Sequence, residues 1–183
     1  ESGYQYHSYL EDGDYSMQFW NPAKEEFYWR EDIYNTFYFQ RGIHSVYLMG
    51  SDSYKAFDIQ AGLRGEHTQV LRSSIEGANR TVNRFEVFPS IHVGYTLPHE
   101  QKLTFAYSYR TNRPELFYME PYITYRDYYT AEIGNPDIRP EYIHSYELNY
   151  KKNIGEQVLQ SSLFYRSRKD KIERLRVPYE AGV

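Results

Sequence analysis

The sequence predicts an all-β fold in which consecutive strands form an antiparallel up-and-down meander. Apolar and polar residues alternate with a period of two through most of the chain after Asp32, and helical periodicity is hard to find. Short and long connections between these segments also take strict turns along the chain. An antiparallel meander sends alternate connections to opposite ends of its sheet, so all tight turns are expected at one end.

Composition is the third observation behind this fold class. Aromatic residues make up 19% of the chain, and 22 of its 183 residues are tyrosines. A tyrosine side chain has an apolar body and a polar tip, so it suits an apolar surface that ends near water. Membrane interfaces and carbohydrate-binding platforms are surfaces of this kind.

The first predicted strands follow an irregular start. Residues 1–30 are rich in Gly, Asp, Asn and Pro, and they show no readable strand register. A strand is predicted around "VYLMG" (46–50), and the next is "FDIQAGLRGEHT" (57–68). In the second of these, one parity carries Phe57, Ile59, Ala61 and Leu63, and the other carries Asp58, Gln60, Arg64 and Glu66.

Two further strands are predicted in the middle of the chain. "FEVFPSIHVGYTL" (85–97) alternates from Val87 to Leu97, with Pro89 marking a bulge, an edge or a strand beginning. "LTFAYSYR" (103–110) places four apolar or aromatic residues on one face: Leu103, Phe105, Tyr107 and Tyr109.

The last predicted strands follow a proline-rich hook. In "GNPDIRP" (134–140) two prolines restrict the residues before them to extended geometry, and Pro140 fits the first position of a strand. The strands "YIHSYELNYK" (142–151) and "LQSSLFYRSR" (159–168) then complete a single segment of about seven strands over residues 1–183.

The connections predict a membrane topology. Three are short, at 50–55, 98–101 and 153–156, and two are long, at 70–83 and 111–140. Short turns at one end and long loops at the other are typical of outer-membrane β-barrels. Several alternating segments also reach the roughly 9–11 residues that a tilted strand needs to cross a bilayer.

Other features exclude several classes of protein. The net charge of −4 gives no reason to expect a nucleic-acid partner. Cysteine is absent, and no run of 18 apolar residues or N-terminal signal peptide occurs. The six histidines lack metal-site spacing and no nucleophile elbow is present, so we expect no metal, no cofactor and no enzymatic activity.

Several phrases resemble the barrel region of TonB-dependent outer-membrane receptors, in the form common among Bacteroidetes. The matching phrases cover roughly residues 33–175, and they are Tyr107 to Pro114, Met119 to Tyr122, Gly134 to Glu141, the strand around Glu147, "GLRGEHT" (62–68) and "FPSIHVGY" (88–95). Glu120 departs from the family pattern, which has a small amide before that proline, so any contact of that amide is lost or altered.

The resemblance implies a function and a location. Such receptors are barrels of about 22 strands in the bacterial outer membrane, with a plug domain in the lumen. They import an iron chelate, glycan, cobalamin or peptide with energy passed on by TonB. The chain would be a piece of such a barrel without its plug, and its partners would be the TonB complex, the plug, outer-membrane lipids and a possible surface lipoprotein.

Two groups of residues are candidates for the functional site. Arg64, Glu66 and Glu147 lie on the polar parity of their strands, and we expect them to face the lumen and the plug. Aromatic residues of the long loop could stack on a sugar ring or a chelate; these candidate ligand-binding residues are Tyr118, Tyr122, Tyr125, Tyr128 and Tyr129.

Two other functions fit the same patterns. The first is a soluble, tyrosine-rich β-sandwich that binds carbohydrate, and the second is an outer-membrane anchor or adhesin that transports nothing. The isolated segment would be an open sheet or an edge-paired oligomer. Since its edges and apolar face would be uncovered, we expect it to self-associate through its edges, or to fold that face onto itself, rather than keep a barrel's curvature.

Overall fold

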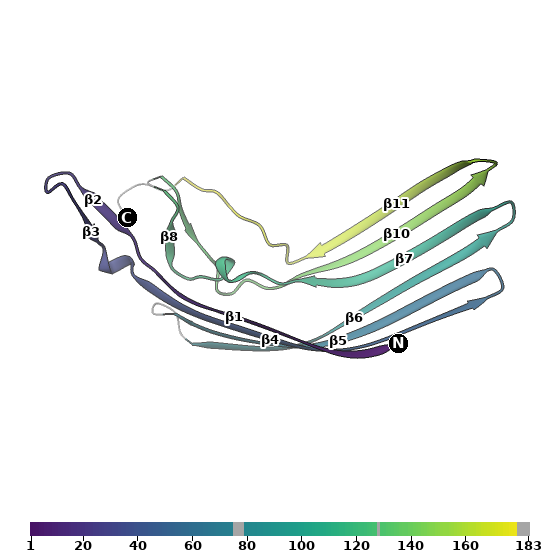
Figure 1. Cartoon of the computed structure of the whole chain (residues 1–183), viewed down its shortest axis with the longest axis horizontal. Coiled ribbons are helices and arrows are strands. Elements are labelled where there is room, and N and C mark those ends of the chain that lie inside the picture. The colour runs from purple at the N-terminus through teal and green to yellow at the C-terminus, as the bar shows by residue number, and fades with distance from the viewer. Residues whose placement is uncertain (75–78, 128, 179–183) are drawn as a thin grey trace.

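Seven strands form one open antiparallel sheet in the computed structural model of the chain (Figure 1). The structure describes residues 1–74, 79–127 and 129–178. In sheet order the strands are β1 (Ser2–Tyr15), β4 (Asn35–Tyr54), β5 (Phe57–Ser74), β6 (Arg80–Leu97), β7 (Gln101–Asn112), β10 (Glu141–Ile154) and β11 (Gln157–Lys169). The predicted all-β antiparallel meander is confirmed.

Small elements lie in the connections. Two two-stranded sheets are formed by β2 (Gln18–Asn21) with β3 (Glu26–Trp29) and by β8 (Ile123–Tyr125) with β9 (Ala131–Ile133). The connections also contain two short 3-10 helices, η1 (Glu31–Ile33) before β4 and η2 (Leu116–Tyr118) after β7. Within the described residues, no helix is long and apolar enough to cross a membrane.

The connections segregate to the two ends of the sheet. Tight turns join β4 to β5, β6 to β7 and β10 to β11 at the right-hand end in Figure 1. They use left-handed backbone at Lys55, His99, Glu100 and Gly155, which matches the twist of the strands that they join. The β1–β4 and β7–β10 connections, which carry the two small sheets, lie at the other end.

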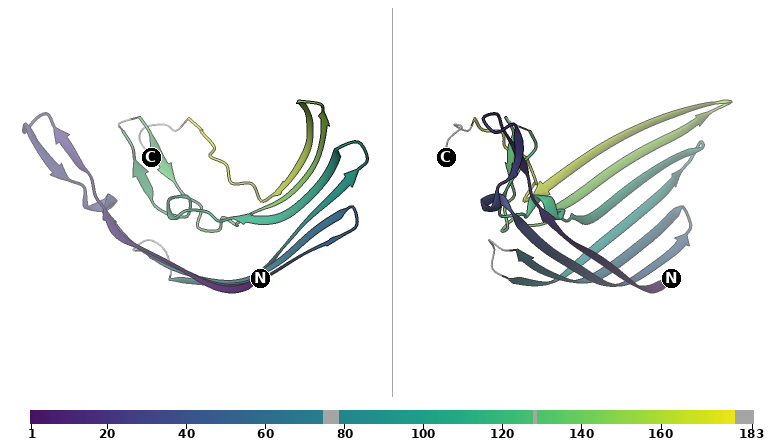
Figure 2. Two further views of the ribbon diagram at one scale, coloured as in Figure 1. Left: turned by 45° about the vertical axis from the view of Figure 1, so that its right-hand side comes forward. Right: turned by 60° about the vertical axis from the view of Figure 1, so that its left-hand side comes forward.

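Three expectations from the sequence are corrected. Residues 1–30 are not irregular, because β1 pairs with β4 from Ser2 to Tyr15. The loop expected over 70–83 is mostly strand, since β5 continues to Ser74 and β6 starts at Arg80, with 75–78 outside the described residues. The sheet also keeps an open, curved shape instead of folding its apolar face onto itself (Figure 2), because its ladders stay in register and their twist accumulates.

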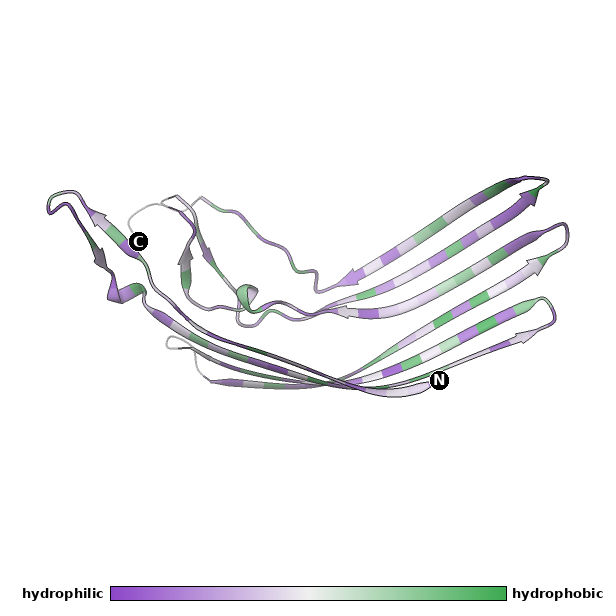
Figure 3. Cartoon of the chain, in the orientation of Figure 1, coloured by the Kyte–Doolittle hydropathy of each residue, from purple (hydrophilic) through white to green (hydrophobic). Residues whose placement is uncertain are grey.

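One face of the sheet, which we call the outer face, is apolar. The pairing register aligns Ile59, Val93, Phe105, Leu148 and Leu163 across five neighbouring strands. These side chains are partly or largely exposed, and Leu163 is 70% exposed. The alternation of apolar and polar residues along the strands is visible in Figure 3.

Aromatic side chains bound this apolar band at both ends. Near the tight turns, the rings of Phe57 and Tyr95 lie 4.5 Å apart. Toward the other end, His44 and His67 lie 6.5 Å apart, and the rings of Tyr109 and His144 stack at 4.4 Å. At about 3.3 Å per residue and a tilt of about 40°, the strand from Phe57 to His67 rises roughly 25 Å, the height of a bilayer-facing band.

The opposite, inner face carries the charges. The register places every charged residue of β5, β6 and β7 on this face: Asp58, Arg64, Glu66, Arg72, Arg80, Arg84, Glu86, Lys102 and Arg110. A membrane barrel excludes charge from its lipid-facing positions, whereas its lumen is polar. The two faces of the sheet obey that division.

Pro89 marks the point where the sheet divides. β6 pairs with β7 only from Ser90 to Leu97, although β6 itself begins at Arg80. Proline has no amide hydrogen, so Pro89 cannot donate to a ladder with β7. Of the three alternatives expected for this proline, the local edge is the one that the structure contains.

A long loop, residues 113–140, packs its two ends, 113–122 and 134–140, onto the concave inner face, and the β8–β9 hairpin between them projects away from the sheet (Figure 2). Its Leu116 and Met119 join Phe39 of β4 in a small buried core, and Phe39 is 1% exposed. β10 begins directly after Pro140, as the sequence predicts. This loop therefore contributes most of the buried apolar contacts among the described residues.

Gly134 lets the two ends of this loop approach closely. Its amide donates to the carbonyl of Glu120 at 2.8 Å, and the amide of Asn135 donates to the carbonyl of Tyr118 at 2.7 Å. A Cβ on Gly134 would lie 2.6 Å from the backbone nitrogen of Glu120 and 2.8 Å from the carbonyl carbon of Tyr118. Only glycine fits this contact.

We expect Gly134→Ala to detach the hook from the loop. Overpacking of this kind costs about 1–3 kcal/mol, which corresponds to roughly fivefold or more faster exchange of the Gly134 and Asn135 region. Hydrogen exchange of the complete protein, read by mass spectrometry, measures it. Gly50→Ala is the control, because a Cβ there meets no atom within 4 Å. Unchanged exchange in Gly134→Ala would contradict the contact.

Candidate functional site

The candidate site is a buried polar network on the inner face, centred on Glu66 of β5. Glu66 is 6% exposed. Its Oε1 accepts from Nε of Arg64 at 2.5 Å, and its Oε2 accepts from Nη2 of Arg113 at 2.5 Å. A carboxylate between two guanidinium groups is a strong, charge-assisted arrangement.

Arg113 ties the long loop to the barrel wall. It is the first residue after β7, and its Nη2 also lies 3.1 Å from Oε2 of Glu86 and 3.2 Å from Oγ1 of Thr68. The hydroxyl of Tyr142, on β10, donates to the other oxygen of Glu86. The network therefore bridges the place where β6 and β7 separate.

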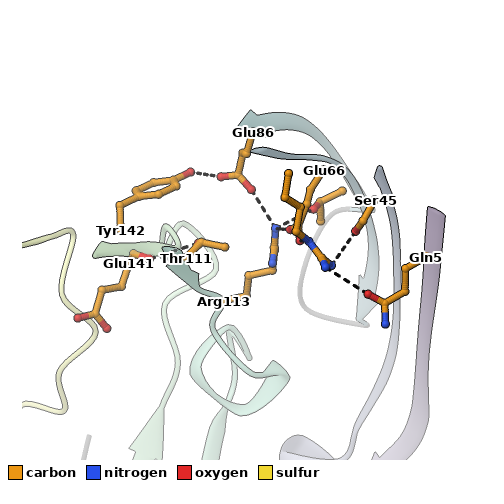
Figure 4. Close-up of polar contacts among 10 residues, drawn as sticks. Gln5, Ser45, Glu66, Glu86, Thr111, Arg113, Glu141 and Tyr142 are labelled. Carbon is orange, nitrogen blue, oxygen red and sulfur yellow. Dashed lines mark hydrogen bonds and ion pairs between the residues drawn. The ribbon is translucent and has the colours of Figure 1, made fainter. Parts of the chain in front are cut away.

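Arg64 extends the network along the sheet. Its Nη2 donates to the fully buried hydroxyl of Ser45 at 3.0 Å, and its Nη1 donates to Oε1 of Gln5 at 3.2 Å. The contacts thus join β1, β4, β5 and β6 to the long loop and to β10 (Figure 4). A buried ion pair gains little net stability, but it fixes the partners in one arrangement.

A cavity of about 330 Å³ opens beside this network. Its wall is the inner face of β4, β5 and β6, and the loop covers it with Pro114, Met119 and residues 136–140. Six arginines line it: Arg41, Arg72, Arg80, Arg84, Arg113 and Arg139. A second cavity of about 410 Å³ shares Arg72 and Arg80 with the first.

The lumen residues expected from the sequence lie on the inner face. Arg64 and Glu66 are members of the network, and Glu147 lies on the same face of β10, beside Ala106 of β7. Glu147 is exposed and makes no ion pair among the described residues. The structure thus brings together two of the three, and their expected contact with a plug stays a prediction.

The loop tyrosines do not converge on one surface. Tyr122 is 3% exposed and lines the second cavity, whereas Tyr129 is 83% exposed. Tyr125 donates its backbone amide to the hydroxyl of Tyr15 at 2.6 Å, and Tyr118 lies under Arg174. Tyr128 lies outside the described residues. Most of these tyrosines pack the loop against its neighbours, and of the four described ones only Tyr122 lines either of the two cavities described above.

The sequence pattern does not predict the arginine-lined cavity. Arg72 and Arg80 fall within 70–83, where the sequence predicts a loop and therefore no strand parity. They are in fact direct cross-strand partners in the β5–β6 ladder. The available signal was their spacing, since Arg72 shares its parity with Glu66 and Arg80 shares its parity with Arg84 and Glu86.

Glu120 occupies the position where the resemblance implies a small amide. Burial raises the pKa of the Glu120 carboxyl, although a hydrogen bond with Tyr122 opposes the shift. Burial and the neighbouring Glu120 also raise the pKa of the Tyr122 phenol. Ionised Glu120 is therefore a source of instability in the loop at neutral pH.

Replacing Glu120 with glutamine is expected to stabilise the loop at neutral pH. An acid whose folded pKa is raised binds protons more tightly when folded, so wild-type stability falls as pH rises through and above the ordinary glutamate range. Glu120→Gln should abolish that decline. Amide protection factors for the Gly134 and Asn135 region at pH 5 and pH 7.5 measure it. An equal decline in both proteins would contradict this account.

Histidines and acidic residues do not assemble into a metal site in the part of the chain that the structure describes. The histidines with ring contacts, His44, His67 and His144, lie instead on the outer face, among tyrosines. The hydroxyl of Tyr107 lies 3.0 Å from Nδ1 of His144 in this layer. These histidines serve the aromatic boundary of the apolar band.

The two faces and the loop polarity define a class of protein. An apolar outer band edged by aromatic rings, a charged inner face and tight turns at one end are the features of a membrane-spanning β-barrel wall. The family model of the outer membrane protein beta-barrel family matches residues 1–183, and the chain belongs to that family. No curated protein matches the chain.

Membership of this family locates the protein. It is an outer-membrane β-barrel protein, which places it in the bacterial outer membrane. Members of the family are typically not enzymes. The soluble carbohydrate-binding sandwich is therefore excluded as an alternative.

Proposed function

We propose that the chain is part of the barrel of a TonB-dependent receptor that imports a nutrient across the outer membrane. The observation that carries the proposal is the charged, networked inner face. A plug domain needs a polar lumen wall with fixed ion pairs to seat against. Glu66, Arg64 and Arg113 supply one, and Glu147 extends it toward the tight turns.

The long loop supports the same proposal. The two ends of the loop, 113–122 and 134–140, pack over the inner face and cover the arginine-lined cavity there. A loop that narrows the lumen at its long-loop end is suited to hold a ligand before import. An anchor or adhesin has no need of such a cavity.

The partners follow from the proposal. Further strands of the complete barrel would pair with β1 and β11, the outermost strands of the sheet, and lipids would cover the outer face. Without these strands, an isolated segment would self-associate through the same edges. The plug would contact the inner face, the TonB complex would engage from the periplasm, and a surface lipoprotein could cap the long loops.

A transport assay tests the function. Cells that carry or lack the complete protein are grown on a panel of iron chelates, cobalamin, glycans and peptides, each as the limiting nutrient. The proposal predicts a growth defect with one class, reproduced when TonB is removed. Loss of the receptor without any growth defect, or uptake that is indifferent to TonB, would contradict it. A defect in attachment alone would support the anchor or adhesin.

A further inference from the structure

The cavity on the inner face holds an unusual concentration of positive charge. Its charged lining consists of six arginines against Glu86 and Asp137. Asp137 pairs with Arg80, and Glu86 is already shared by Arg113 and Tyr142. Both acidic groups are thus engaged, and several guanidinium groups are left without an acidic partner in the described residues.

Arg72 is the clearest case of an unsatisfied cation. Its Nε is buried and has no hydrogen-bond partner in the described part of the chain. Its direct cross-strand partner in the β5–β6 ladder is another arginine, Arg80. Like charges directly opposite each other destabilise a sheet, and a buried donor without an acceptor costs further free energy. A bound anion would remove both costs.

Arg84 lies on the same face, four residue pairs further along the same ladder. It is the cross-strand partner of Thr68, and Val70 with Val82 lies between it and the Arg72–Arg80 pair. Arg84 interacts with the hydroxyl of Tyr142, but it makes no ion pair among the described residues. Arg72 and Arg84 therefore present two guanidinium groups on either side of an apolar floor.

The remaining lining defines the rest of the ligand. Phe39, Val70, Val82 and Met119 give the cavity an apolar wall next to the arginines. A volume of about 330 Å³ is within the range that holds a small organic molecule. The planar guanidinium fork matches the oxygen atoms of a carboxylate or a phosphate.

We propose that this cavity binds a small organic anion that has a carboxylate or phosphate group and an apolar body. Arg72 holds the charged group, Arg84 supplies a further positive charge across the apolar floor, and the apolar wall holds the body. If the anion is the imported nutrient, or a part of it, this role rests on the proposed receptor function. Binding of the anion to the cavity does not depend on that function.

The test uses the complete protein purified in detergent, with three probes of similar size: phenyl phosphate, benzoate and neutral benzyl alcohol. Binding is measured by titration calorimetry. We expect one or both anions to bind and benzyl alcohol not to bind, and the preferred anion distinguishes phosphate from carboxylate. Arg72→Gln should weaken binding roughly tenfold or more, because it removes a charge-assisted hydrogen bond. Arg84→Gln should weaken binding less, because it removes only a nearby positive charge.

Arg110→Gln is the matched control, because Arg110 lies on the inner face of β7 and does not line the cavity. Its affinity should stay close to that of the wild type. Three results would contradict the proposed site. Neither anion binds, benzyl alcohol binds as tightly as the anions, or Arg110→Gln loses as much affinity as Arg72→Gln. Each variant is first checked for the faster-migrating unboiled band of a closed barrel. Anion binding without TonB-dependent uptake would contradict the receptor function but would still support the anion-binding site.

Discussion

Glu66→Gln should be among the most damaging single substitutions on the inner face. It removes the carboxylate that accepts from both Arg64 and Arg113 and leaves two guanidinium groups without that partner in a largely buried place. Breaking a buried ion pair from one side costs about 3–5 kcal/mol, because the remaining charge stays desolvated. Since Arg64 is about one-third exposed and Arg113 keeps its ion pair with Glu86, we expect a cost below that range, about 2 kcal/mol.

The measurement is the free energy of unfolding of the complete protein in denaturant, together with hydrogen exchange of residues 113–140. Both should change, since Arg113 holds that loop to the wall. Asp58→Asn is the control on the same strand and face, because its ion pair with Lys102 is exposed and should matter little. A small effect of Glu66→Gln, similar to that of the control, would show that the network does not hold the loop.

Val93→Arg should block insertion or destabilise the barrel strongly. Val93 lies on the outer face in the middle of the apolar band, between Ile59 and Phe105 in the register. Arginine at the midplane of the lipid-facing surface of a barrel costs about 2–4 kcal/mol, and the cost falls toward the interfaces. The quantity to measure is the amount of heat-modifiable protein in the outer membrane.

The matched control for Val93→Arg is Thr104→Arg. Thr104 lies on the neighbouring strand and faces inward, opposite Gly94 and Asn149. The same charge is thus placed at a similar height on the other face, where it meets the polar lumen. Equal amounts of assembled barrel for both variants would contradict the assignment of the faces.

The bilayer-facing part of the fold was the part that sequence could predict. Within the apolar band the outer parity must be uncharged and the inner parity is polar, so "FDIQAGLRGEHT" and "LTFAYSYR" show their faces directly. The proline hook also has a local cause, and the structure starts β10 directly after Pro140.

The strand ends beyond the band were predicted poorly for a physical reason. Above the bilayer the outer face meets water and the inner face meets the packed loop, so each face carries both apolar and polar residues. Leu71 and Ser73 face outward, whereas Val70 and Val82 face the cavity. The period-two alternation is weak there, so the sequence does not show that Arg72 and Arg80 lie on the inner face and line a cavity.

The polar network around Glu66 cannot be predicted from the sequence for another reason. Arg113 contacts Glu66 and Glu86 across 47 and 27 positions of sequence, at a place where β6 and β7 have separated. Parity places Glu66 on the inner face, but it does not show which loop residue comes to meet it. Only the fold brings these groups within hydrogen-bonding distance.

The division of the sheet into a lipid-facing and a lumen-facing side is the central claim, and one measurement tests it most directly. Single cysteines are placed at consecutive positions of β7 in the complete protein, labelled with a fluorophore and reconstituted with brominated phospholipids, which quench by contact. The described sheet predicts strong quenching at Leu103, Phe105 and Tyr107, and weak quenching at Thr104, Ala106 and Ser108. Quenching without this alternation, or with the opposite parity, would contradict it.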